Sequence, residues 1–225
     1  MRRCGVFAIM ILLVALGSGC VDDTLVPDQP SQPAASSSVT LDPEQLARAL
    51  VLQAGWPQEG IENKAAPEAL PQIVNFQRQE VLGNIVHYSC QVRVGPGEYD
   101  LIGIHRVVKE RQPGVPVKTG KSIFLLHGDL VPFVPKFLFG WHAPNVPDDH
   151  AAAIYWAQRD VDCWGIDQSW QLVPLEETDF AFMEHWGLQH EVDNLRTGLA
   201  IARVARGLTG SGTEPMILLG YSSGL

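Results

Sequence analysis

Three short apolar runs, separated by two segments with helical periodicity, limit the folds open to this chain more than any other feature. The runs occupy residues 123–126, 161–167 and 216–219, and the helical segments occupy residues 148–159 and 188–206. A short continuous apolar run is typical of a strand that is buried on both faces of a parallel sheet. Strands that alternate with helices form βαβ units with right-handed crossovers. The sequence therefore predicts an α/β fold with a parallel sheet.

An antiparallel pair of strands is predicted just before this region. Apolar and polar side chains alternate over residues 86–94, and a second apolar segment spans residues 101–108. The sequence Gly-Pro-Gly lies between the two segments, so they are predicted to form a hairpin. His87 and His105 fall on its polar face, where we expect them to be solvated.

A serine between glycines follows the third apolar run. The five residues are Gly220, Tyr221, Ser222, Ser223 and Gly224. In the pattern G-x-S-x-G after a strand, the glycines allow a sharp turn that lifts the serine hydroxyl clear of the sheet. The same sequence pattern is also found in Gly/Ser-rich turns that have no catalytic role. The strand before the motif and the motifs below favour the nucleophile elbow.

Three motifs together carry a resemblance to a known family. They are LLHGD (125–129), DCWGID (162–167) and GYSSG (220–224). With the antiparallel start, residues 84–225 resemble the N-terminal half of an α/β-hydrolase. The resemblance implies an α/β-hydrolase fold with a mostly parallel sheet and an antiparallel N-terminal hairpin, truncated after the fifth strand. One departure is the sequence Asp-Gln-Ser-Trp at residues 167–170, where many members read Asp-x-Arg-Gly; it bears on the substrate more than on the fold.

The resemblance implies a serine hydrolase of the esterase or lipase kind that acts on a small-molecule or lipid ester. Ser222 would form the acyl-enzyme, and no cofactor or metal ion is expected. Negative charge on the carbonyl oxygen requires preorganised N–H donors. The implied donors are the backbones of Ser223, Asp129 and Leu130. His127 and Gly128 would support the loop that carries the last two.

The family places a carboxylate and then a histidine after the nucleophile, whereas only residues 223–225 follow Ser222 here. We therefore expect a truncated chain that is inactive as it stands and whose third apolar run is an exposed sheet edge. Earlier histidines are disfavoured as substitutes, because strand order fixes the order of the triad: His142, His150, His185 and His190. The alternatives are a non-catalytic remnant or binding lipoprotein, and an acyltransferase or peptidase on the same scaffold.

The N-terminal residues predict export and a lipid anchor. Residues 1–20 combine a basic start, an apolar stretch and small residues before Cys20, which resembles the lipobox of bacterial lipoproteins. Acylation of Cys20 would anchor the protein to a membrane of the bacterial cell envelope; ordinary secretion is the alternative. Residues 21–40 read as a flexible linker, residues 41–83 as an N-terminal helical segment, and residues 84–225 as the partial hydrolase domain.

Composition excludes some functions and leaves others open. A net charge of −9 without a basic cluster argues against nucleic-acid binding. Cys90 and Cys163 lie in apolar strand patterns, which favours unpaired core cysteines over a disulfide. The histidines and carboxylates of residues 185–193 lack the spacing of H-E-x-x-H, so a polar helix start is favoured over a metal site. The aromatic segment 131–141 is predicted to form either an acyl-binding wall or lipid-contacting lip, or a face that packs under a later part of the fold.

Overall fold

The computed structural model describes residues 73–138 and 145–224. All of them belong to one unit of the chain, Ser38–Leu225. The predicted leader, Cys20, the linker and residues 41–72 of the predicted helical segment lie outside the described residues. No helix among the described residues is both long enough and apolar enough to span a membrane.

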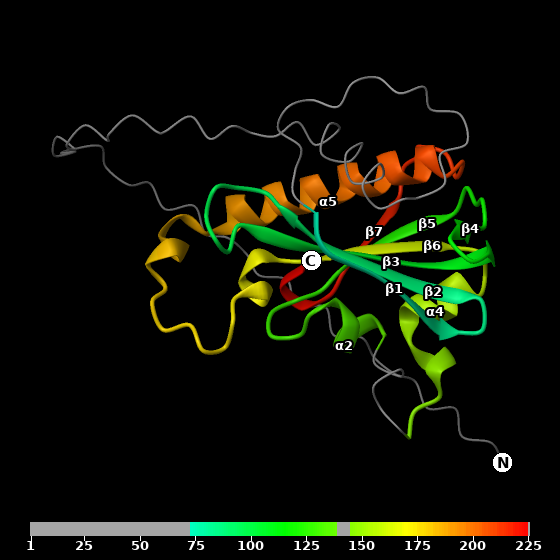
Figure 1. Ribbon diagram of the computed structural model, residues 1–225, viewed down its shortest axis with the longest axis horizontal. Helices are drawn as coiled ribbons and strands as arrows, with labels where there is room; N and C mark the ends of the chain where they lie inside the picture. Colours follow the sequence, from blue (N-terminus) through cyan, green and yellow to red (C-terminus); the bar gives the residue numbers. More distant parts are fainter. Residues whose placement is uncertain (1–72, 139–144, 225) are drawn as a thin grey trace, which may run out of the picture. The chain divides into compact units, whose positions relative to one another are not determined.

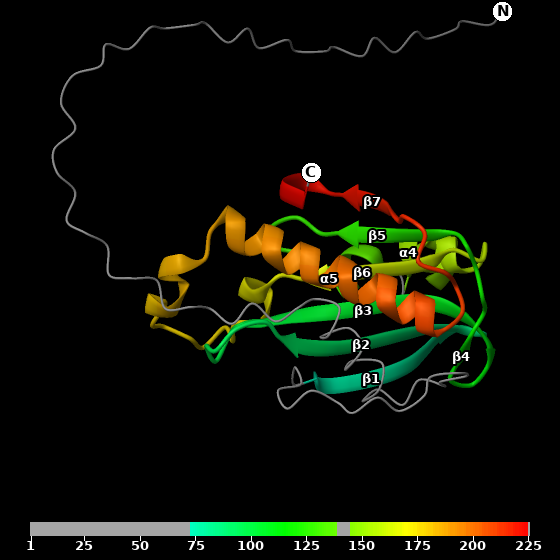
Figure 2. The ribbon, with the colours of Figure 1, turned by 90° about the horizontal axis from the view of Figure 1, so that it is seen from above.

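A mixed sheet of seven strands forms the centre of the fold (Figure 2). Its strands are β1 (Ile73–Leu82), β2 (Ile85–Arg93), β3 (Leu101–Gln112), β4 (Val115–Pro116), β5 (Ser122–Leu126), β6 (Asp162–Asp167) and β7 (Ile217–Gly220). Their order is β1-β2-β3-β6-β5-β7, and the short β4 pairs with β3. Neighbours from β1 to β6 are antiparallel, whereas β5 runs parallel to both β6 and β7. The predicted hairpin and the predicted parallel strands are therefore confirmed.

Helices cover both faces of the sheet (Figure 1). The long helix α5 (Leu188–Leu208) lies on one face, and the short helices α2 (Phe133–Phe137) and α4 (Ala152–Ala157) lie on the other. Four 3₁₀ turns complete the description: η1 (Asp148–His150), η2 (Ser169–Leu172), η3 (Ala181–His185) and η4 (Ser222–Gly224). The predicted helix 148–159 is thus divided between η1 and α4, and the predicted helix 188–206 is confirmed as α5.

The central strands are buried on both faces, as their apolar runs predict. On β5, Phe124 and Leu126 pack with the core under α5, while Ile123 and Leu125 pack with the core under α2 and α4. Gly198 lets α5 approach closely, because a Cβ there would lie 2.4 Å from the Cγ2 of Ile166. These contacts fix the sheet beneath the loops that carry the motifs.

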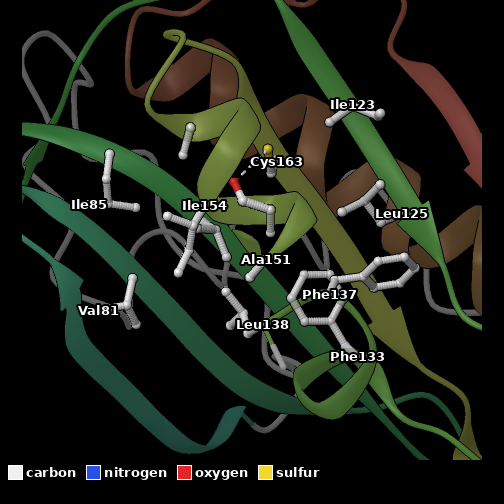
Figure 3. Packing of buried hydrophobic residues seen from close by; sticks show 13 residues of the cluster. Val81, Ile85, Ile123, Leu125, Phe133, Phe137, Leu138, Ala151, Ile154 and Cys163 are labelled. Atoms are coloured by element: carbon white, nitrogen blue, oxygen red, sulfur yellow. Dashed lines mark hydrogen bonds between the residues drawn. The ribbon is translucent and has the colours of Figure 1, made fainter. Parts of the chain in front are cut away.

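Two parts of the observed fold differ from the expectations. Residues 73–82 form strand β1 instead of continuing a helical segment, and β1 pairs antiparallel with β2. The aromatic segment after β5 forms helix α2, which was not predicted. Phe133, Phe137 and Leu138 are buried against Ile123, Leu125 and α4, as Figure 3 shows. These three side chains are therefore neither part of an exposed acyl-binding wall nor left uncovered for a later part of the fold to pack on. Residues 139–144 of the same segment lie outside the described residues.

Strand β7 and the cysteines agree with the sequence expectations. β7 ends the sheet, and its side chains are exposed by 68% at Ile217, 50% at Leu218 and 41% at Leu219. Cys90 and Cys163 are buried and unpaired. Burial raises the pKa of the Cys90 thiol to about 12 and that of Cys163 well above its ordinary value, so both thiols stay protonated and unreactive.

Candidate active site at the carboxyl ends of the parallel strands

Ser222 lies immediately beyond the end of β7 in a strained backbone conformation. Its φ is 58°, in the left-handed region that residues with a Cβ rarely adopt. The backbone N–H of Tyr221 donates to the carbonyl of Leu126 at 3.0 Å, which holds the start of the turn against β5. The side chain of Ser222 is exposed. A strained, exposed serine at a strand end matches the geometry that a nucleophile elbow requires.

Two glycines let the loop after β5 contact this turn. A Cβ on Gly128 would lie 2.6 Å from the Cβ of Ser222 and 2.7 Å from the carbonyl oxygen of Tyr221. A Cβ on Gly224 would lie 2.7 Å from the carbonyl oxygen of His127. Side chains at either position would separate the two segments. The structure thus brings the HG motif and the GYSSG motif together, and Gly220 joins β7 to the turn.

The predicted oxyanion loop is strained, and one of its predicted donors has a partner. Leu130 has a φ of 69° and a side chain that is 88% exposed. The Asp129 N–H donates to the hydroxyl oxygen of Ser223 at 2.9 Å, and that hydroxyl donates to Asp129 Oδ1 at 2.9 Å. The side chain of Ser223 therefore occupies the Asp129 N–H that the sequence assigns to an oxyanion.

His127 connects the loops after β5 and β6. Its imidazole is buried, with Nδ1 2.7 Å from the carbonyl oxygen of Gly128, while the N–H of Gln168 donates to Nε2 at 3.3 Å. Both contacts are satisfied by the tautomer with its proton on Nδ1, an assignment from the hydrogen-bond network. The ring also meets Trp170 edge to face at 5.8 Å. These contacts are those of a side chain that supports a loop.

A buried chain of polar groups continues from the end of β6 across the sheet. Asp167 Oδ1 accepts the N–H of Phe133 at 2.6 Å, and Oδ2 accepts Nε2–H of His105 at 2.9 Å. Nδ1 of His105 lies 3.0 Å from Nε2 of His87. Burial alone would raise the pKa of Asp167, but His105 and the Phe133 N–H hold it below its usual range. An ionised Asp167 therefore fixes the start of α2, directly after the predicted oxyanion loop.

The expectation that His87 and His105 are exposed to solvent is wrong. The two side chains are 2% and 6% exposed, because Phe133 of α2 covers that face of the hairpin. Its ring stacks on His105 at 4.5 Å and on His87 at 6.2 Å. Strand alternation assigns a side chain to a face but does not say what covers the face. The available signal was two histidines on one face beside an aspartate at the end of a neighbouring strand.

A pocket of about 350 Å³ lies beside the loop after β5. Asp129 bounds one side, and Trp170, Trp186, His190 and Glu191 are among the residues that line the rest. Because the same Asp129 contacts Ser223, the pocket adjoins the turn that carries Ser222.

No hydrogen bond joins Ser222 Oγ to a histidine among residues 73–138 and 145–224. His190 interacts elsewhere: its Nε2 lies 3.1 Å from the hydroxyl of Ser169, and its ring stacks on Trp186 at 5.0 Å. His142 lies outside the described residues. The described part of the chain therefore holds a candidate nucleophile and its loop without a general base in contact with it.

Comparisons with known proteins bear on the fold. No protein-family model matches the sequence, and no curated protein sequence matches it. Among solved structures, a candidate lipase from Sulfolobus solfataricus is similar, with a TM-score of 0.53 and 18% identity over 67% of this chain and 43% of that chain. A candidate acetyl xylan esterase from Bacteroides fragilis aligns with a TM-score of 0.36 and 12% identity over 81% of this chain and 47% of that chain. The alignments thus span less than half of either solved chain.

With the mixed sheet, the similarity to the first structure indicates an α/β-hydrolase-like fold. At 18% identity it bears on the fold alone, and it assigns no catalytic residue.

Proposed function

We propose that this chain carries the nucleophile half of a serine hydrolase that acts on carboxylic esters, with Ser222 as the nucleophile. The observation that carries the proposal is the left-handed backbone of Ser222 beyond β7, with Gly128 of the neighbouring loop directly against its side chain. Strain of this kind costs on the order of 1–3 kcal/mol and persists where the surroundings enforce it. Here the close contact of Gly128 and the Tyr221–Leu126 hydrogen bond enforce it.

In the proposed reaction, Ser222 Oγ forms a bond to the carbonyl carbon of the ester while a general base takes the hydroxyl proton. The bond from that carbon to the alcohol oxygen then breaks, and the alcohol leaves with the proton. Water attacks the acyl-enzyme in the second half and releases the carboxylic acid together with free Ser222. The balance needs no oxidant, reductant or cofactor.

Oxyanion stabilisation by this loop requires one rearrangement. The Asp129 N–H, now bound to the Ser223 hydroxyl, becomes available to the substrate oxygen when that hydroxyl rotates away. The backbone N–H groups of Ser223 and Leu130 are the other proposed donors. His127 and Asp167 hold the loop without a hydrogen bond to Ser222, and Gly128 lets the loop lie against the Ser222 side chain.

Labelling with a fluorophosphonate probe tests the proposal. In the protein as its natural source produces it, we expect covalent labelling that mass spectrometry locates at Ser222 and that a Ser222→Ala variant loses. In the isolated 225-residue chain we expect no labelling above the same variant, because no base in the described residues contacts Ser222. Labelling of the natural protein that does not depend on Ser222 would contradict Ser222 as the nucleophile. Strong labelling of the isolated chain would contradict the proposal that the general base lies outside this chain.

A second candidate function is a non-catalytic binding protein on the hydrolase scaffold. The occupied Asp129 N–H and the absence of a histidine contact to Ser222 in the described residues favour it. A natural protein that binds esters but gives neither labelling nor hydrolysis would support this function over the first.

We also propose that Cys20 is acylated and anchors the protein to a bacterial envelope membrane, where a small-molecule or lipid ester would reach it. Metabolic labelling with an alkyne fatty acid tests this. Incorporation into the wild-type protein and its loss in Cys20→Ala are expected, whereas equal incorporation in both would exclude the site.

A further inference from the structure

The pocket beside Asp129 carries negative charge without a matching cation among its described lining residues. Asp129 and Glu191 contribute carboxylates, and no described lysine or arginine lines the pocket. Glu191 lies in the first turn of α5. Lys136 does not line the pocket, and its Nζ sits over the ring of Tyr221, 3.1 Å from the centroid.

The histidine of the pocket does not offset this charge at neutral pH. Burial lowers the pKa of His190, and this effect exceeds the opposing influence of Asp100, Glu191 and Asp193. His190 is therefore neutral at pH 7, so it leaves the negative charge of the two carboxylates uncompensated.

Aromatic and thioether groups supply most of the remaining lining. Trp170, Trp186 and Met183 line the pocket. The Trp186 ring stacks on His190 at 5.0 Å and meets Phe182 edge to face at 5.3 Å. Indole rings attract cations through their quadrupole, most of all when the cation is partly desolvated.

We infer that this pocket binds the alkylammonium part of a cationic ester, with the two carboxylates supplying charge and the indoles supplying cation–π contact. The inference rests on the proposed function in so far as the bound molecule is a substrate: Asp129 lines the pocket and contacts Ser223, so an ester held there by its ammonium group would lie next to the turn that carries Ser222. An anionic group would meet two carboxylates and no described cation, and the pocket should reject it.

Binding of three small probes tests the inference on a Ser222→Ala chain, where chemistry at the serine plays no part. The probes are choline, its uncharged isostere 3,3-dimethylbutan-1-ol, and the anion 3,3-dimethylbutanoate, each titrated against tryptophan fluorescence. Choline is expected to bind about 10-fold more tightly than the alcohol, and the carboxylate more weakly than either. Added salt should weaken choline binding and leave alcohol binding unchanged.

Two variants that remove the same charge at different places test where the probes bind. Glu191→Gln is expected to weaken choline binding about 5-fold without affecting the alcohol, whereas Glu214→Gln, exposed before β7, should change neither. Equal affinity for choline and the alcohol, tighter binding of the carboxylate, no binding of any probe, or equal effects of the two variants would overturn the inference. A failed labelling experiment at Ser222 would leave these affinities as they are, so the two proposals fail separately.

Discussion

Strand β6 begins and ends with a buried aspartate, and the two carboxylates have different partners. At its start, Asp162 accepts two hydrogen bonds from Arg106 at 2.9 and 2.8 Å, and Nη1 of Arg206 lies 3.8 Å away. At its end, Asp167 accepts an imidazole N–H and the backbone N–H of Phe133. The first carboxylate joins side chains of β3, β6 and α5, whereas the second fixes the end of a loop.

The cluster at the start of β6 is a structural group of ion pairs, whereas the cluster at its end positions a loop. Arg106, Asp162 and Arg206 are essentially inaccessible, and burial lowers the pKa of Arg206 although the Asp162 carboxylate opposes this shift, so these three charges depend on one another for pairing. Asp167, by contrast, accepts the N–H of Phe133 at the end of the loop that carries the exposed, strained Leu130. A buried charge alone therefore does not indicate a functional site. A buried charge that positions a strained and solvent-accessible loop is the better indication.

Removing the carboxylate at the start of β6 should have the largest effect on stability. Asp162→Ala leaves two buried guanidinium groups without their counter-charge, and we expect a loss of about 3–5 kcal/mol in the free energy of unfolding. Urea denaturation measures this loss. Asp149→Ala, an exposed aspartate in η1, serves as the control and should change stability by less than about 0.5 kcal/mol.

Gly128→Ala should disrupt the contact between the loop after β5 and the Ser222 turn, because the added methyl group has no space there. The new Cβ would lie 2.6 Å from that of Ser222, so either the loop or the elbow must move. We expect a stability loss of about 1–3 kcal/mol and, in the natural protein, a roughly 100-fold slower fluorophosphonate reaction. Gly120→Ala is the matched control, because a Cβ added there would meet no atom within 4 Å. Equal effects of the two substitutions would contradict the close contact.

Asp167→Asn should reveal a pH dependence at the end of β6. The lowered pKa of Asp167 means that its ionised form adds stability above the ordinary aspartate pKa of about 4, and that this stability is lost as pH falls below that value. We expect Asp167→Asn to be about 1–2 kcal/mol less stable than wild type at pH 7, with the gap narrowing towards pH 3. A gap that is constant from pH 7 to pH 3 would show that the charge of Asp167 does not contribute.

Ser223→Ala should have the smallest effect, confined to the loop. Removal of the hydroxyl leaves the Asp129 N–H without its bond at 2.9 Å, so amide hydrogen exchange at Asp129 should accelerate about 10-fold. The free energy of unfolding should fall by no more than about 1.5 kcal/mol. Ser222→Ala provides the comparison, since its hydroxyl makes no bond to that N–H; unchanged exchange in Ser223→Ala would contradict the contact.

Much of the fold could be predicted from local patterns in the sequence. The apolar runs of β5, β6 and β7, the periodicity of α5 and the alternation in β2 and β3 each arise from the repeat of one element, so no knowledge of its neighbours is needed. Ser222 is predicted from glycines at fixed spacing after a strand, which have a specific backbone consequence, whereas the roles of Gly128 and Asp129 are implied by the family resemblance. Strand β1 and helix α2 were missed, since β1 lacks strict alternation and α2 is only a short turn of aromatic residues.

The sequence by itself thus determined strands β2, β3, β5, β6 and β7 and the motifs that stand at the ends of the last three. Only the tertiary structure decided that His87, His105 and Asp167 form one buried chain under Phe133, and that the Ser223 hydroxyl binds the Asp129 N–H. Contacts of this kind join β2, β3, α2, β6 and the Ser222 turn, which are far apart in the chain. The face that a side chain occupies follows from the geometry of its own element, whereas what covers that face depends on how distant elements pack.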